Sequence, residues 1–317
     1  MIYDTIIIGS GLAGLTASIY ASRYRLTNAI IGKLPGGTIN LAHKVENFPG
    51  FPGITGVELA QKVILHAQSF GVKILSEHVS KIDRIDNVFE VITESGKKLQ
   101  GKTIIATTGT ERRKLGVPGE KEYLGKGVSY CTHCDAPFFK NKTVAMVGGS
   151  DAAVSGAIHL SSIARKVYII YRKDQLRAEP VWVEEVTSNP KIEIVYNTNV
   201  VEILGDGNKV TGVKLDNAYR ESETLVLDGV FIEIGGIPAS SFLIPLGVEL
   251  NENGYVQINE KMETNVAGVF AAGDFTTQGL VLQQAITAAA QGAIAASYAF
   301  KYVRSRQKTV DRAAKAM

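Results

Sequence analysis

Apolar positions follow the periods of strands and helices from the start of the chain. Tyr3–Ile8 ends in three consecutive isoleucines and is a predicted strand, Gly11–Tyr20 carries small and apolar residues at helical spacing, and Asn28–Ile31 is the next strand. This order predicts the opening of a βαβ unit. Further elements are a helix at Gly56–Phe70 and strands at Val72–Leu75, Val88–Thr93 and Thr103–Thr107.

The same pattern begins again in the middle of the chain. Thr143–Val147 is a predicted strand, Ala152–Ala164 a helix and Val167–Tyr171 the next strand. The fold class is therefore α/β, with two doubly wound, Rossmann-like nucleotide-binding domains. Two alternating segments, Glu193–Leu204 and Lys209–Leu215, are predicted to be antiparallel strands.

The last part of the chain holds one short strand and one long helix. The strand runs through Gly268–Asp274, and an alanine-rich helix extends from Gln283 to about Tyr302. A lone strand and helix are best explained if they return to complete the first domain. We therefore expect the second domain to be inserted into the first.

Composition limits the classes of function. The 317 residues are 45% apolar and 21% charged, as in a globular protein of about two domains. A net charge of +3 is too small to indicate nucleic-acid binding. The N-terminus shows no signal-peptide pattern and no apolar run approaches a membrane span, so we expect a cytoplasmic protein without membrane attachment.

The first glycine-rich turn follows a predicted strand and opens a predicted helix. Gly9 permits the turn, Gly11 lets the backbone approach a pyrophosphate, and Gly14 allows close helix–strand packing. The helix amides then face the negative charge. The acidic residue that usually binds a ribose about 20 positions later is missing, because the sequence there is Ile30-Ile31-Gly32-Lys33.

The second turn is less regular. It runs through Gly148, Gly149, Ser150 and Asp151, where the serine side chain would either crowd a pyrophosphate or hydrogen-bond to it. Basic residues follow the next strand: Arg172, Lys173 and Arg177. They suit the 2′-phosphate of NADP rather than NAD, and the alternative is solvated surface charge.

The only two cysteines form a Cys-x-x-Cys pair, Cys131 and Cys134. Beside two nucleotide-type turns, such a pair indicates electrons passing through a flavin to a disulfide. The alternative is structural zinc, but a second ligand pair is missing and the remaining histidines show no ligand spacing, so we expect no metal site. Asp135 is a candidate proton donor and acceptor or else a cap for the next turn, and His133 is expected to tune the thiol pKa.

One acidic turn lies near the end of the chain. Gly273-Asp274 closes a predicted strand before a helix. The carboxylate of Asp274 is placed to accept a hydrogen bond from a ribityl or ribose hydroxyl, with helix capping as the alternative.

Together and in this order, the motifs resemble the low-molecular-weight thioredoxin reductase family over nearly the whole chain. The segments that carry the resemblance are Gly9–Gly14, Glu46–Phe51, Thr107–Gly109, Cys131–Asp135, Val147–Ala153, Arg172–Arg177, Thr264–Asp274 and Gln284-Ala285. The resemblance implies tightly but non-covalently bound FAD in residues 1–112 and 243–317. It also implies a pyridine-nucleotide domain at residues 113–242 that carries the cysteines, and a homodimer.

The resemblance also implies roles for single residues. Cys134 would lie nearest the flavin, Cys131 would attack the substrate disulfide, and Asp135 would be the acid and base. FAD would be held by Gly9, Gly11, Gly14, Asn47, Gly109, Gly273, Asp274, Gln284 and Ala285. NADPH would be held by Gly148, Gly149, Ser150, Asp151, Arg172, Lys173 and Arg177.

Several positions depart from the family's usual residues. Ser150 replaces a third glycine and Tyr171 a histidine. The other departures are Thr38, Ala152, Ser155, Lys173 and Gln283. Most of them fall in the pyridine-nucleotide site, so NADH and reduced ferredoxin stay open as alternative electron donors.

The resemblance implies a thioredoxin reductase that passes electrons from NADPH through FAD and the dithiol to thioredoxin or a thioredoxin-like protein. A flavin-binding redox sensor without turnover is the alternative from another class. The dithiol and the nicotinamide site belong to one inserted domain, and both must reach one flavin. We therefore expect this domain to rotate about the crossings near Glu111–Lys114 and Gly235–Ser240.

Overall fold

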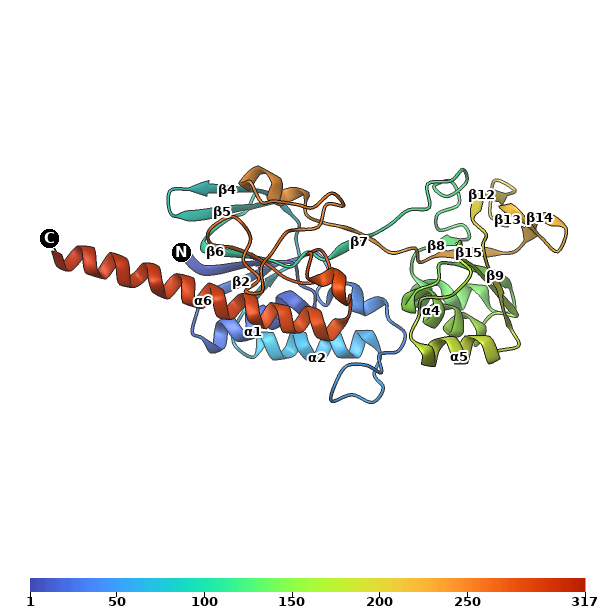
Figure 1. Ribbon diagram of the computed structural model, residues 1–317, viewed down its shortest axis with the longest axis horizontal. Helices are drawn as coiled ribbons and strands as arrows, with labels where there is room; N and C mark the ends of the chain where they lie inside the picture. Colours follow the sequence, from blue (N-terminus) through green and yellow to red (C-terminus); the bar gives the residue numbers. More distant parts are fainter. Residues whose placement is uncertain (317) are drawn as a thin grey trace. The chain divides into compact units, whose positions relative to one another are not determined.

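The computed structural model describes residues 1–316, and side chains as far as Gln307. Contacts divide it into two compact units (Figure 1). The first comprises Met1–Asn40, Val45–Glu111 and Ile237–Met317, and the second comprises Leu41–Lys44 and Arg112–Gly236. The helices are α1 (Leu12–Arg23), α2 (Gly56–Gln68), α3 (Thr132–Asp135), α4 (Asp151–Ser161), α5 (Pro180–Ser188) and α6 (Ala285–Ala316).

The first unit contains a mixed sheet in the order β3-β2-β1-β6-β5-β4, with β17 also paired to β6. The parallel strands are β1 (Ile2–Ile8), β2 (Asn28–Ile31), β3 (Lys73–Leu75), β6 (Lys98–Ala106) and β17 (Val269–Ala271). β4 (Val79–Ile85) and β5 (Val88–Thr93) extend it as an antiparallel ribbon.

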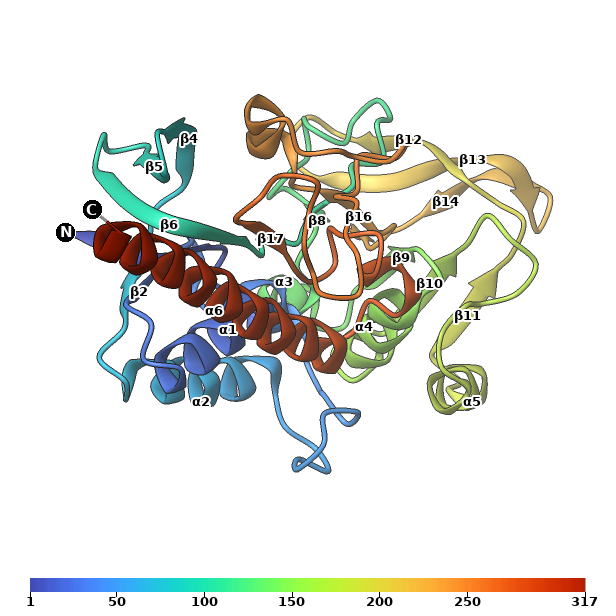
Figure 2. The ribbon, with the colours of Figure 1, turned by 60° about the vertical axis from the view of Figure 1, so that its left-hand side comes forward.

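Helices cover one face of this sheet. Ile7, Ile30 and Ile105 point into a core shared with α1 and α6, whereas Ile6 and Ile104 point to the opposite face. Figure 2 shows α1 and α6 lying along one another. The opposite face is covered by apolar residues of the β4–β5 ribbon and of the segment that follows Pro238, which include Phe89, Leu243 and Val248.

The return of the chain to this sheet confirms the predicted insertion. β17 pairs in parallel with β6, so that Val269 lies opposite Ile104. Gly292 lets α6 pack closely against the backbone of α1. A methyl group at this position would lie only 2.1 Å from the carbonyl oxygen of Ala13. The last strand and helix therefore complete the first unit.

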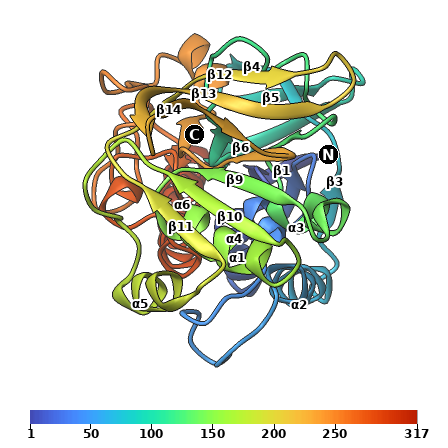
Figure 3. The ribbon, with the colours of Figure 1, turned by 90° about the vertical axis from the view of Figure 1, so that its right-hand side faces the viewer.

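The second unit is built on a parallel sheet in the order β11-β10-β9-β15-β8. These strands are β8 (Val128–Ser129), β9 (Thr143–Val147), β10 (Lys166–Ile170), β11 (Ile192–Val195) and β15 (Gly229–Ile232). α4 and α5 cover one face and the antiparallel sheet β12 (Val200–Gly205), β13 (Val210–Tyr219) and β14 (Ser222–Val226) covers the other, as Figure 3 shows. Both units therefore have Rossmann-like parallel strands, with helices on one face and mostly strands and loops on the other.

One strand prediction differs from the structure. Glu193–Leu204 is not a single antiparallel strand, because β11 joins the parallel sheet and β12 starts a separate one. The break lies at Asn197, whose φ of 52° is left-handed. Asparagine tolerates that conformation, so the chain turns without a glycine or proline to mark the turn.

The two crossings between the units run side by side. β7 (Thr110–Arg112) pairs with β16 (Gly236–Pro238) in a two-stranded sheet. Ala239 N donates to the oxygen of Gly109 and Arg113 N to that of Gly235, an antiparallel pairing. Two of the unit boundaries, Glu111/Arg112 and Gly236/Ile237, fall within this ribbon.

Within the described part of the chain, no helix combines enough length with enough apolar character to span a membrane.

Candidate active site

The cysteine pair forms a disulfide at the start of α3. Cys131 and Cys134 are joined, with their Cα atoms 5.3 Å apart. Cys131 is the N-cap residue of α3, and the backbone N–H of Cys134 donates to its Sγ at 3.1 Å. Because a hydrogen bond to sulfur favours the charged form, this arrangement stabilises a Cys131 thiolate once the disulfide is reduced.

Ser129 positions Cys131 from the end of β8. Its hydroxyl accepts from the Cys131 N–H at 3.0 Å and donates to the Cys131 carbonyl at 3.2 Å. The residue is buried, and its strand is paired with β15. Ser129 was not among the predicted site residues, because a serine two residues before a cysteine carries no sequence signal until its strand is placed.

A buried acid supports the segment that leads into the disulfide. The Glu120 carboxylate accepts from the N–H groups of Leu115 and Gly116 and from the Tyr130 hydroxyl. Burial opposes ionisation of Glu120, but these hydrogen bonds outweigh it and hold its pKa below the ordinary value. Burial and the neighbouring carboxylate raise the pKa of Tyr130.

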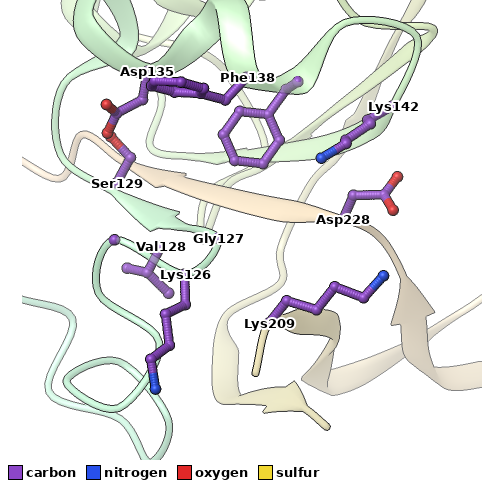
Figure 4. Close-up of a pocket in the computed structure, with 11 residues that line it drawn as sticks. Lys126, Gly127, Val128, Ser129, Asp135, Phe138, Lys142, Lys209 and Asp228 are labelled. Atoms are coloured by element: carbon purple, nitrogen blue, oxygen red, sulfur yellow. The ribbon is translucent and has the colours of Figure 1, made fainter. Parts of the chain in front are cut away.

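Asp135 lines a pocket rather than capping a turn. Its side chain makes no capping hydrogen bond to the turn Ala136–Phe139. The pocket has a volume of about 370 Å³, and Figure 4 shows Asp135 and Phe138 on one side of it and Lys209 on the other. Asp135 directly follows Cys134 in the chain, and its carboxyl group borders this pocket.

Three histidines converge beside the disulfide. The rings of His43 and His159 are stacked with centroids 3.7 Å apart, and His133 lies 5.9 and 6.0 Å from them. Burial, and secondarily the charges of His43 and His133, lowers the pKa of His159 to about 4. Their spacing in the sequence indicates no common site, because the segments meet only in the folded second unit.

The first glycine turn has the predicted geometry. Gly9 has φ +111°, and a methyl group on it would lie 2.2 Å from the oxygen of Thr107, while one on Gly14 would lie 2.0 Å from the oxygen of Gly9. A methyl group on Gly11 would meet nothing closer than 3.9 Å. α1 starts here without a side-chain cap or a first-turn acid. Space at Gly11 and open helix amides suit a phosphate group.

Two further candidate residues meet at the start of α6. Asn47 Nδ2 donates to Gln284 Oε1 at 3.3 Å, and Ala285 is the first residue of α6. Gly273, which precedes α6 in the sequence, has φ +95°, and its N–H donates to Gln291 Oε1 at 2.7 Å.

Asp274 and Gly109 lie after β17 and β6, at the same edge of the sheet. Burial raises the pKa of Asp274 to about 6. Among the described side chains and backbone groups, no donor hydrogen-bonds to the Asp274 carboxylate, so a capping role has no support. The hydroxyl of a ligand would satisfy this buried carboxylate. Gly109 has φ +66° and accepts from Ala239 N.

The ring of Tyr171 packs against the second glycine turn. Gly148 has φ +140°, and a methyl group there would lie 2.1 Å from the oxygen of Glu233. A methyl group on Gly149 would lie 2.7 Å from the ring of Tyr171. Ser150 caps α4 without a side-chain hydrogen bond, and Asp151 Oδ1 accepts from Glu179 N at 2.7 Å. Glycine at position 149 is thus required by its neighbour as well as by any ligand.

The basic residues lie beside this turn. Arg172, Lys173 and Arg177 are all exposed. Arg177 N donates to the oxygen of Gly149 at 2.7 Å, and Nε donates to the Tyr171 hydroxyl at 3.1 Å. These contacts attach Arg177 to the glycine turn and orient its guanidinium. The three cations suit a phosphate on a nucleotide bound there.

Comparison with known proteins gives a consistent family. The family model described as pyridine nucleotide-disulphide oxidoreductase matches residues 3–292. Thioredoxin reductase of Bacillus subtilis is 41% identical over 312 residues, which cover 98% of this chain and 97% of the relative. That of Listeria innocua is 40% identical over 313 residues, with the same coverage of both chains.

A solved structure shares the fold. The crystal structure of Lactococcus lactis thioredoxin reductase matches with a TM-score of 0.91 and 35% identity. The match covers 96% of this chain and 99% of the other.

Proposed function

The chain belongs to the pyridine nucleotide-disulphide oxidoreductases and, within them, to the FAD-dependent thioredoxin reductases, and we propose that it reduces the disulfide of thioredoxin at Cys131 and Cys134 with electrons from NADPH. The observation that carries the proposal is the disulfide itself, with its hydrogen bond from Cys134 N to Cys131 Sγ.

The first unit fits FAD. The space at Gly11 and the uncapped start of α1 would receive the pyrophosphate, and the Asp274 carboxylate would accept from a hydroxyl of the linker. Asn47 and Gln284 would lie near the flavin, with Gly109 and Gly273 shaping the turns. We assign FAD binding to residues 1–112 and 243–317.

The second unit, residues 113–242, is assigned to the pyridine nucleotide. The turn at Gly148–Asp151 would face the pyrophosphate, while Arg172, Lys173 and Arg177 would bind the 2′-phosphate that distinguishes NADPH from NADH. Bound FAD and NADPH would together supply the electron pair that returns the disulfide to the dithiol.

The cysteines then act in sequence. The Cys131 thiolate attacks one sulfur of the substrate disulfide, and the other substrate sulfur leaves as a thiolate. The Cys134 thiolate attacks Cys131 Sγ, which releases the reduced substrate and restores the Cys131–Cys134 disulfide. Asp135 takes the proton of a cysteine thiol and delivers it to the departing thiolate.

Paired serine variants test this order. In Cys134→Ser, Cys131 still attacks thioredoxin but no second enzyme thiol resolves the mixed disulfide. A covalent complex should therefore accumulate once the thiolate freed on thioredoxin is alkylated and cannot reverse the attack. In Cys131→Ser that complex should be absent. Both should lose NADPH-dependent thioredoxin reduction. Turnover unchanged in Cys131→Ser would refute the proposal, and mass spectrometry under non-reducing conditions detects the complex.

The remaining assignments rest on the family. We propose a homodimer, which light scattering would measure, and a cytoplasmic location, because an enzyme that keeps thiols reduced suits a reducing compartment. Rotation of the inserted unit about the β7–β16 ribbon stays a prediction. A crosslink that locks the unit and leaves turnover intact would contradict it.

A further inference from the structure

Three of the five histidines of the chain gather in the second unit. His43 lies in the Leu41–Lys44 segment, His133 in α3 between the two cysteines, and His159 near the end of α4. One ring nitrogen of each lies within 4.8 Å of those of the other two. The fold therefore assembles the three rings from separate segments, and the proposed reaction assigns no step to the cluster as a whole.

Packing of α3 on α4 holds two of the rings together. A methyl group on Gly156 would lie 3.1 Å from Thr132 Oγ1, so this glycine lets α3 approach α4 closely. Thr132 is buried and directly precedes His133, while His159 lies one turn of helix after Gly156. The backbone thus brings His133 towards His159 without help from the rings themselves.

The spacing suits a metal ion. In a tetrahedral zinc site with Zn–N distances of about 2.1 Å, ligand nitrogens lie roughly 3.4 Å apart. The ring nitrogens lie within 4.8 Å of one another, and the stacked rings of His43 and His159 must turn out of their parallel arrangement for both nitrogens to face one ion. Three imidazoles with one open position are a common zinc ligand set, and imidazole also suits copper and nickel.

One of the rings also lacks a partner. Nδ1 of His159 is buried and makes no hydrogen bond within residues 1–316. A buried polar atom without a partner destabilises the folded protein. Coordination through this nitrogen would give the atom the partner that the described protein does not provide.

We propose that His43, His133 and His159 bind a divalent transition-metal ion, with Zn²⁺ the best match, beside the redox disulfide. The ion would join α3, α4 and the Leu41–Lys44 segment within the second unit. Because His133 lies between the cysteines, a fixed His133 would restrain α3 and slow thiol–disulfide exchange at Cys131. Zinc would therefore act as a reversible inhibitor.

Zinc binding is measured on the oxidised FAD-loaded enzyme, in which the cysteines are joined and offer no thiolate ligand. Equilibrium dialysis with elemental mass spectrometry should find one zinc per chain at saturation. His43→Ala should weaken binding about tenfold or more, as should His159→Ala. His43 is exposed, so loss of folding does not confound its variant.

Matched controls come from the two histidines outside the cluster. His66→Ala and His78→Ala should bind zinc like the wild type, and so should a Cys131→Ser/Cys134→Ser double variant. Absence of zinc from the wild type, unchanged binding in His43→Ala, or loss of binding in the double cysteine variant would each overturn the proposal. None of these outcomes bears on thioredoxin reduction, which the serine variants test separately.

The inhibitory effect has its own readout. Zinc at saturating concentration should slow reaction of the prereduced wild type with thioredoxin disulfide, and a chelator should restore the rate. The same zinc concentration should slow His43→Ala less. Equal inhibition of both enzymes would show that zinc acts on the thiolates and would overturn the inhibitory role.

Discussion

The side-chain amide of Asn47 donates to Oε1 of Gln284 at 3.3 Å, joining two loop residues that are 237 positions apart. The resemblance alone assigned both to FAD, and the fold brings them together in the first unit. The hydrogen bond links the two amides from segments on either side of the insertion.

Asn47→Ala should therefore weaken FAD binding. Loss of one hydrogen bond and of the orientation of Gln284 is expected to raise the dissociation constant about fivefold, in line with roughly 1 kcal/mol per bond. Fluorescence of released flavin measures this. Gln61→Ala removes an exposed amide from α2 and should leave FAD affinity unchanged. Equal loss in the two variants would contradict a specific role for Asn47.

Asp135→Asn tests proton transfer. The amide keeps the shape of the side chain but cannot carry the proton, so kcat for thioredoxin reduction should fall about 10²-fold or more while the fold is retained. Asp228 borders the same pocket, and its carboxylate accepts from Thr143 N at 2.9 Å.

Asp228→Asn is the matched control for that variant. It should lower the free energy of unfolding by about 1 kcal/mol and leave kcat nearly unchanged. Stopped-flow kinetics and urea titration separate the two effects. If Asp135→Asn kept wild-type kcat, Asp135 would not be the acid and base.

Local patterns explain what the sequence could predict. The βαβ units and the turns at Gly9 and Gly148 depend on residues close together in the chain, and both were recognised. The turn at Asn197 has a weaker sequence signal, because Asn197, Thr198 and Asn199 interrupt the apolar pattern without a glycine or proline. Short paired strands such as β8 and β15 carry too few residues for a periodic signal.

Contacts between distant segments explain what could not be predicted. The histidine cluster depends on three separate segments, and α3 approaches α4 closely where Thr132 packs against Gly156. The ring of Tyr171 against Gly149 likewise appears only in the folded unit, although both residues had been noted separately.

Arg177→Ala tests whether NADPH or NADH is the electron donor. If Arg177 binds the 2′-phosphate, the KM for NADPH should rise about 10- to 100-fold, whereas the KM for NADH, which lacks that phosphate, should barely change. Arg165 is exposed and donates to Thr143 Oγ1, so Arg165→Ala is a control for loss of charge. Equal effects on both nucleotides would point to a structural role for Arg177 beside Tyr171.

Gly149→Ala should impair the same site through packing. The added methyl group would meet the Tyr171 ring at 2.7 Å, so either the ring or the turn must move. Differential scanning calorimetry should show that the free energy of unfolding falls by about 1–3 kcal/mol. The double variant Gly149→Ala/Tyr171→Ala removes the clash and should lose less than the sum of its single variants. Additive losses would show that the two residues do not limit each other.

The raised pKa of Asp274 should make the free energy of unfolding of the flavin-free protein depend on pH. Burial raises its pKa from 3.8 to about 6, so the folded form holds the proton more tightly than the unfolded chain. The resulting stability is fully present below about pH 4 and declines as the pH rises through 6, by at most about 3 kcal/mol. Urea unfolding of the apoprotein between pH 4 and 7 measures the decline. Asp274→Asn should remove this decline in stability, because asparagine does not titrate.

Bound FAD should also reduce the decline, by donating a hydroxyl hydrogen bond to the ionised carboxylate. An unchanged slope in Asp274→Asn would assign the pH dependence to other groups.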